Sequence, residues 1–382
     1  MADDMREADG LGGGSAPVRI TGPSGLVAAV PFLIGFEPAE SVVLVFTRSP
    51  SGTVVLCLRV DLPSDGAEAV TQLISEVRRT VRRAIGLGAR LDRVQTAIFS
   101  ADASRLPHAD LVAGLSRVLA AEGLDVAEGL CVHADRWWSF SCSDGCCPGT
   151  GHASNDAWGV KAAFDLVTAG LGYVANRAAL ARQLAPDPGL MMAADEIAAA
   201  LATCRQHRDS GRADTRWRRE IEDGLLAWLC CTRSAQAPET AEAPHERTLA
   251  LWACSLSDSR VREPILHRLL FEGGARHRSR RLTGARTALI DMVRRVPVPE
   301  VAPVAAVLAA IAWQQGDGAF ARMAGERALA ADPRNTLARL VLDAASSGVP
   351  PSEWELLMGR FTPAMLRGSR RTASDVTGRR TA

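Results

Sequence analysis

The feature that most constrains the fold is a change of hydrophobic pattern near residue 150. Upstream, short β-branched apolar runs alternate with segments of helical period; the runs lie at 41–46, 53–62, 94–99 and 126–133. Downstream, the apolar spacing is helical, beginning with 156–169, 176–184, 193–207 and 215–232. Strands that alternate with helices favour a helix-covered sheet. The pattern therefore predicts an α/β N-terminal layer, with a mostly parallel sheet and an edge hairpin formed by Trp137–Ser141, followed by an all-α region.

The chain of 382 residues is longer than one ordinary hydrophobic core requires. Composition shifts divide it into six parts: a disordered arm at 1–17, an α/β domain with a cysteine loop at 18–152, a helical region at 153–234, a Pro- and Ala-rich linker at 235–244, a second helical region at 245–367, and a disordered tail at 368–382. Near the start of the α/β domain, we expect a short helix that begins at Pro23 or Ser24, continues to Val30 and is closed by Pro31.

The end of the second helical region is similar to a tetratricopeptide unit. Gly316–Asn335 follows the pattern of its second helix, with small residues at Ala321 and Ala328 and a helix-ending Pro333. A first helix is expected over about 303–315. Because the chain has one clear unit and an isolated unit cannot bury its own face, this tetratricopeptide-like pair is expected to pack on the preceding helices.

Charge and hydropathy exclude several classes of protein. The formal net charge is +1, so no overall field attracts nucleic acid or a membrane surface. No apolar run approaches the ~18 residues that span a bilayer, and the first residues are acidic where a secretory signal would be basic. The run Arg276–Arg286 lacks interleaved aromatic residues, so nucleic-acid binding is not expected. We expect a cytoplasmic protein without a membrane partner.

Three of the nine cysteines lie within six positions of one loop. The spacing of Cys142 and Cys146 suits two thiolates on one zinc ion, and Cys147 and His152 are candidate completing ligands. Against this, adjacent cysteines such as Cys146 and Cys147 point apart in an extended chain. A reactive thiol is a second interpretation. The interpretation that we favour is a buried structural loop in which cysteines and tryptophans serve as packing.

Charged residues near the strand ends form a second candidate site. Arg59 and Asp61 are two apart, so they project from the same face of a strand, and Asp102 follows the next strand. Ligands of open α/β sheets gather beyond the carboxyl ends of the strands, so these three residues are candidates for ligand binding. The alternative is a structural Arg–Asp pair with a helix N-cap, which short carboxylates commonly provide, and the sequence favours it.

Several separated motifs together resemble an actinobacterial family. They are Pro31–Pro38 with Ser41, Arg59–Pro63, Trp138-Ser139 leading to Cys142 and Cys146–Pro148, and Trp313 with Gly316–Gly318. The family is catalogued as domain of unknown function 4192, and the resemblance covers about 18–353. It implies a cytoplasmic bacterial protein and implies no reaction.

The sequence thus leaves two hypotheses for function. The first is a protein-binding, adaptor or regulatory module that meets a partner through its C-terminal helices, because a tetratricopeptide-like pair occurs without a recognisable catalytic motif. The second is an enzyme or small-ligand-binding protein that uses the rim around Arg59 and Asp61, with zinc at the cysteine loop as a possible cofactor. The oligomeric state stays open.

Overall fold

A computed structural model describes residues 18–63, 66–102, 106–142, 147–209, 214–231, 244–349 and 351. The chain forms two compact units. The first comprises Met1–Leu184, Ala312–Met323 and Arg339–Glu353, and the second comprises Ala185–Ile311, Ala324–Ala338 and Trp354–Ala382. The expected arm at 1–17 and tail at 368–382 lie outside the described residues. Within the described ranges, no helix combines the length and apolarity needed to cross a membrane.

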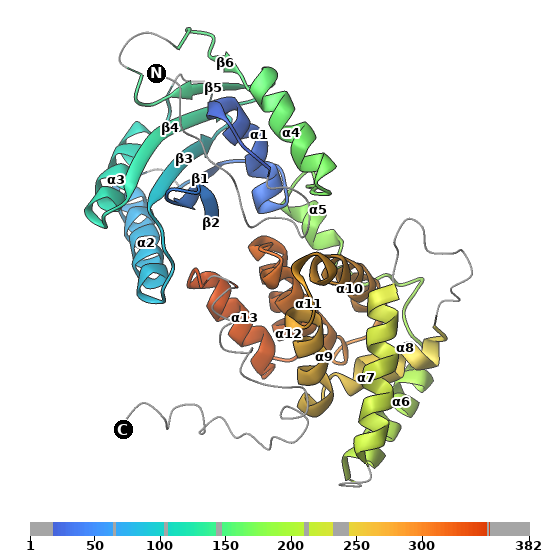
Figure 1. The fold of residues 1–382 in the computed structure, drawn as a ribbon. Coiled ribbons are helices and arrows are strands. Elements are labelled where there is room, and N and C mark those ends of the chain that lie inside the picture. The colour runs from blue at the N-terminus through green and yellow to red at the C-terminus, as the bar shows by residue number, and fades with distance from the viewer. Residues whose placement is uncertain are drawn as a thin grey trace, which may run out of the picture. The chain divides into compact units, whose positions relative to one another are not determined.

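A mixed sheet of six strands forms the centre of the first unit (Figure 1). The strands are β1 (Ser41–Arg48), β2 (Thr53–Asp61), β3 (Arg93–Phe99), β4 (Asp125–His133), β5 (Arg136–Ser139) and β6 (His152–Ala153), in the order β2-β1-β3-β4-β5-β6. Among these strands, β3 and β4 form the single parallel pair. The prediction of a mostly parallel sheet is therefore wrong. Tight connections join β1 to β2 and β4 to β5, and such short loops permit only antiparallel neighbours.

The hairpin expected at Trp137–Ser141 is confirmed, because β5 pairs with β4 and places Ser139 opposite Leu130. Three strands nevertheless share one direction. β1 is antiparallel to both β2 and β3, and β3 is parallel to β4. The carboxyl ends of β2, β3 and β4 therefore lie at the same end of the sheet. The first residue of β1 lies at this end too, between the last residues of β2 and β3.

Helices cover both faces of the sheet. They are α1 (Gly22–Ile34), α2 (Ala67–Gly86), α3 (Ala109–Ala121) and α4 (Ala157–Thr168), and the short helix α5 (Arg177–Arg182) follows α4. α2 and α3 pack on the face that carries Val42, Leu44 and Phe46, all fully buried. α1 and α4 pack against each other on the other side (Figure 1). Every residue in 42–46 is buried, which explains why the sequence of β1 is a continuous apolar run.

Helix α1 extends beyond its predicted end. It continues through Pro31 to Ile34 and ends at Gly35, whose φ of 82° is left-handed. The expectation that Pro31 closes the helix is therefore wrong. Proline removes one backbone donor, but the Gly35 amide still bonds to the Pro31 carbonyl oxygen at 2.8 Å, so the last turn is kept.

Helices continue along the rest of the described chain. They are α6 (Ala194–Asp209), α7 (Asp214–Cys231), α8 (Glu246–Ser255), α9 (Ser259–Phe271), α10 (Ala275–Arg295), α11 (Val301–Gln314), α12 (Gly318–Ala331) and α13 (Thr336–Ser346). Within the second unit, the buried carboxylate of Glu222 pairs with Arg268 at 3.1 Å. Helices occur where the tetratricopeptide-like pair was expected, and Ala321 and Ala328 are fully buried. The likeness to that repeat stays a prediction.

Candidate functional site

Arg59 and Asp61 lie near the carboxyl end of β2, where they contact each other. The Arg59 Nη1 atom is 2.5 Å from the Asp61 Oδ1 atom. Arg59 also donates through Nη2 to the Ala39 carbonyl oxygen at 3.1 Å, and its Cζ atom lies 5.8 Å from the centre of the Phe36 ring. The side chain of Arg59 is 17% exposed and that of Asp61 is 71% exposed. The guanidinium is therefore held from three sides, while the carboxylate reaches solvent.

Asp102 lies at the same end of the sheet but beyond an intervening strand. It follows β3, and β1 separates β3 from β2, so about 10 Å of sheet lies between the two positions. The Asp102 backbone amide donates to the Ser100 Oγ atom at 3.1 Å. Arg59 and Asp61 line one cavity, whereas Ser100 and Ala101 line another. Ligand binding by these three residues stays a prediction.

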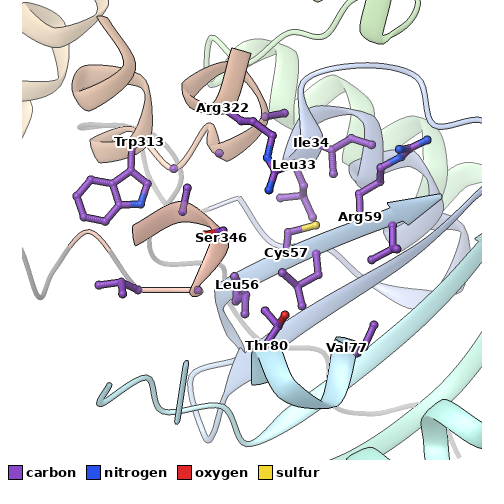
Figure 2. Close-up of a pocket in the computed structure, with 18 of the residues that line it drawn as sticks. Leu33, Ile34, Leu56, Cys57, Arg59, Val77, Thr80, Trp313, Arg322 and Ser346 are labelled. Carbon is purple, nitrogen blue, oxygen red and sulfur yellow. The ribbon is translucent and has the colours of Figure 1, made fainter. Parts of the chain in front are cut away.

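A groove runs along the outer edge of β2 within the first unit (Figure 2). Its volume is about 530 Å³. One wall is β2 with the end of α1 and part of α2, and the other comes from the end of α11, the start of α12 and the end of α13. The residues of the second wall include Trp313, Gly316, Gly318, Ala319, Arg322, Met323, Ala345, Ser346, Gly348 and Val349. We call this cavity the β2 groove.

The β2 groove is open toward the backbone of β2. Every residue from Val55 to Asp61 lines it, although neighbouring side chains of a strand point to opposite faces. A cavity meets consecutive residues in this way when it follows the edge of the strand. β2 is the terminal strand of the sheet, paired with β1 alone among the described strands. The groove therefore borders a free sheet edge.

The register identifies the backbone groups on this edge. The Leu62 amide bonds to the Glu40 carbonyl oxygen at 2.9 Å, and β1 and β2 continue from there in a regular antiparallel register to Leu56. Hydrogen-bonded pairs alternate along antiparallel strands, so Val60 and Leu58 direct their amides toward β1. Cys57 and Arg59 direct theirs outward, into the groove.

The side chains of the β2 groove are mostly apolar, with charges at particular places. Arg177 and Arg322 line it together with Glu76. Figure 2 shows Arg322 extending from α12 toward Leu33, while Trp313 stands on the opposite side of the groove from Arg59. Within the described residues, neither Arg177 nor Arg322 forms an ion pair. The groove therefore offers two guanidinium groups to an occupant, in addition to apolar surface.

Cys57 lies in the middle of the groove as an unreactive thiol. Burial raises its pKa to about 12. This rise lowers the fraction of the thiol that is ionised, and the thiolate is the reactive form. We therefore predict that iodoacetamide at pH 8 alkylates Cys57 several-fold more slowly than N-acetylcysteine, as measured by mass spectrometry of the Cys57 peptide. Equal rates would contradict this account of the groove.

The cysteine loop gathers thiols around Trp138. Buried Cys131 and Cys147 contact this indole in one cluster, and partly buried Cys142 packs against it. Burial, with a smaller contribution from Asp102, raises the pKa of the Cys131 thiol to about 11. Cys131 comes from β4 and was not among the predicted ligands, because eleven positions separate it from Cys142 in the sequence. Cys146 lies outside the described residues.

His152 lies apart from these cysteines. Its ring stacks on Trp137 at a centroid distance of 4.4 Å, whereas the thiols contact the neighbouring Trp138. Successive residues of a strand face opposite sides of a sheet, so the two groups are on different faces of β5. Among the described residues, no three Cys, His, Asp or Glu side chains are placed to hold a metal ion. A zinc site at Cys142, Cys146, Cys147 and His152 stays a prediction.

A hydrogen-bonded network that the sequence did not suggest fixes β5 to α1 and α4. The Trp137 Nε1 atom donates to the Ser24 Oγ atom at 2.9 Å, and the Ser24 hydroxyl donates to the Asp156 Oδ2 atom at 2.8 Å. The Asp156 Oδ1 atom accepts from the amides of Trp158 and Gly159, both at 2.9 Å, and so caps α4. Ser24 is 2% exposed, so its hydroxyl is closed to solvent and fixes the packing of these elements.

The arginine-rich segment contributes to helix ends. On α10, Arg281 Nη2 donates to the carbonyl oxygens of Leu269 and Glu272 at 2.9 and 2.5 Å. Arg278 donates to that of Leu270 at 3.4 Å. These carbonyl groups terminate α9 and lack partners within the helix. The positive charge of these two arginines is therefore used inside the second unit.

Comparison with known proteins identifies one relationship. The model of the family described as Domain of unknown function (DUF4192) matches residues 23–352. No curated protein matches the chain, and no solved structure matches it. The matched range contains the whole sheet, the cysteine loop and both walls of the β2 groove. The chain belongs to the DUF4192 family, whose function is unknown.

Proposed function

We propose that this protein binds an extended segment of a partner polypeptide in the β2 groove. The observation that carries the proposal is the lining of the groove by the consecutive residues Val55–Asp61 of a terminal strand. An extended peptide beside such an edge gains main-chain hydrogen bonds, and pockets on both sides receive its alternate side chains. The second wall comes from α12 and α13, so the C-terminal helices take part in the contact.

The chemistry of the groove indicates the kind of segment. Apolar residues such as Leu56, Leu58 and Met323 favour apolar side chains in the partner. Arg177 of α5 and Arg322 of α12 favour an acidic residue in the partner. We therefore propose an extended, apolar segment that carries at least one carboxylate. As the family resemblance implies, we further propose that it acts in the bacterial cytoplasm.

The test is a selection of twelve-residue peptides on the full chain, followed by affinity measurements on an enriched peptide. Ala319→Trp places an indole in the groove and is expected to weaken binding at least about tenfold, by steric exclusion. Ala330→Trp is the matched control, because Ala330 is exposed on the same helix and does not line the groove. No enrichment, or an enriched peptide that binds the Ala319→Trp protein equally well, would refute the proposal.

Enzymatic or small-ligand use of the Arg59–Asp61 rim is the second candidate. Its support is the exposed Asp61 carboxylate beside Arg59. The Arg59 guanidinium, however, is already engaged by Asp61, the Ala39 carbonyl oxygen and the Phe36 ring. Binding of inorganic phosphate that Arg59→Gln abolishes, without peptide binding by the same protein, would favour this candidate over the first.

A further inference from the structure

A second cavity of about 440 Å³ lies in the first unit, at the carboxyl ends of β3 and β4. α1 and α4 form two of its walls, and the loop before β1 forms a third. The lining comprises Val27, Ala28, Pro31, Phe32, Glu37, Pro38, Ala39, Glu40, Phe99, Ser100, Ala101, Val132, Ala134, Ser154, Asn155, Gly159, Val160, Ala163 and Tyr173. Its volume is typical of a site for a small organic molecule.

The charge of this lining has one sign. Among the described residues, the lining contains Glu37 and Glu40 but no lysine, arginine or histidine. Glu40 is engaged in the fold, since its Oε1 atom accepts the Ala101 amide at 2.5 Å. The Glu37 carboxyl has no hydrogen-bond partner within the described part of the chain. Desolvation raises the pKa of Glu37, as expected for a carboxylate without a compensating cation.

Aromatic rings stand beside Glu37. Phe32 and Tyr173 meet edge to face, with ring centres 4.8 Å apart and planes at 82°. The pKa of the Tyr173 hydroxyl is raised by burial and by the charge of Glu37, so the two groups are neighbours. Aromatic rings and carboxylates are the surroundings that proteins use to bind ammonium groups. Pro31, Phe99 and Val160 add apolar surface for the rest of such a molecule.

We propose that this cavity binds an organic amine, with its ammonium group near Glu37 and Tyr173 and its apolar body against Phe32 and Val160. An ammonium ion supplies the positive charge that is missing beside the two glutamates, and it donates a hydrogen bond to the free carboxylate of Glu37. A neutral or anionic molecule of the same shape gains neither interaction. This site is separate from the β2 groove and takes a different class of ligand.

The test compares three probes of similar shape and different charge: phenethylamine, 2-phenylethanol and 3-phenylpropionate. Ligand-observed saturation-transfer NMR and calorimetry with the full chain are expected to detect the amine alone. Glu37→Gln is expected to weaken amine binding at least about tenfold, because the charge-assisted hydrogen bond is lost. Glu76 lines the β2 groove instead, so Glu76→Gln is expected to leave amine binding unchanged.

A second pair of variants separates loss of the site from loss of folding. Ala163→Phe fills the cavity from α4 and is expected to abolish amine binding. Ala157→Phe is its control, since Ala157 is exposed at the start of the same helix and does not line the cavity. Equal binding of the three probes, no amine binding at millimolar concentration, or binding that survives both Glu37→Gln and Ala163→Phe would overturn the proposal.

Discussion

Replacing Gly159 with alanine is expected to destabilise the first unit by about 3 kcal/mol, because the added methyl group meets backbone atoms that cannot move aside. Gly159 is buried in the first turn of α4, where its Cα faces the Ser154 carbonyl group. A Cβ atom at this position would overlap the Ser154 carbonyl oxygen and lie 3.4 Å from that of Ser24. Relief would require Ser154, in the segment between β6 and α4, to move away from the first turn of α4.

Urea unfolding measures this effect, with Gly86→Ala as the matched control. Gly86 is also helical, and a Cβ atom built there meets nothing within 4 Å. Alanine favours helix over glycine, so the control is expected to raise the free energy of unfolding by up to about 1 kcal/mol. Equal effects of the two substitutions would show that α4 does not pack on Ser154 as described.

Replacing Ser24 with alanine is expected to cost about 2 kcal/mol of unfolding free energy, since a buried donor loses its acceptor and an exposed carboxylate loses one of its donors. The Trp137 indole N–H loses its acceptor, and the Asp156 carboxylate loses a donor. Ser24 is too deeply buried for water to replace the hydroxyl without rearrangement. The change should also loosen β5, which carries the tryptophans of the cysteine loop.

A double-mutant cycle with Trp137→Phe tests the assignment of this network. Once the indole N–H is absent, Ser24→Ala should cost less, so the two losses are expected to fall short of additivity by about 1 kcal/mol. Ser75→Ala is the control, because its exposed hydroxyl bonds to the Thr71 carbonyl oxygen of its own helix and should change stability by less than about 0.5 kcal/mol. Full additivity would argue against the direct bond.

Local patterns sufficed to predict most elements but not strand direction. The continuous apolar run of β1 and the helical period of α2 each follow from residues that are near neighbours in the sequence. Direction depends on which strands become neighbours, and the turn at 49–52 made β1 and β2 antiparallel. Pro31 illustrates another limit of local patterns. The helix continues past this proline, although one backbone donor is lost, and ends instead at Gly35, which adopts the left-handed conformation.

The candidate sites were predictable only where their members are close in sequence. Arg59 and Asp61 are two residues apart on one strand, and their contact follows from strand geometry. The β2 groove instead joins β2 to Trp313 and Arg322, and the buried network joins Ser24 to Asp156 over 132 positions. No periodicity relates such distant residues. Their proximity results from tertiary packing, which a single sequence does not encode in a local pattern.

Residue-resolved hydrogen exchange along β2 tests the central claim most directly. In the free protein, the outward amides of Cys57 and Arg59 are expected to exchange rapidly, whereas those of Leu58 and Val60, which face β1, exchange slowly. An enriched peptide bound in the β2 groove should slow exchange at Cys57 and Arg59 at least about tenfold, because both amides gain acceptors. Binding that leaves these two amides unprotected would contradict strand addition at β2.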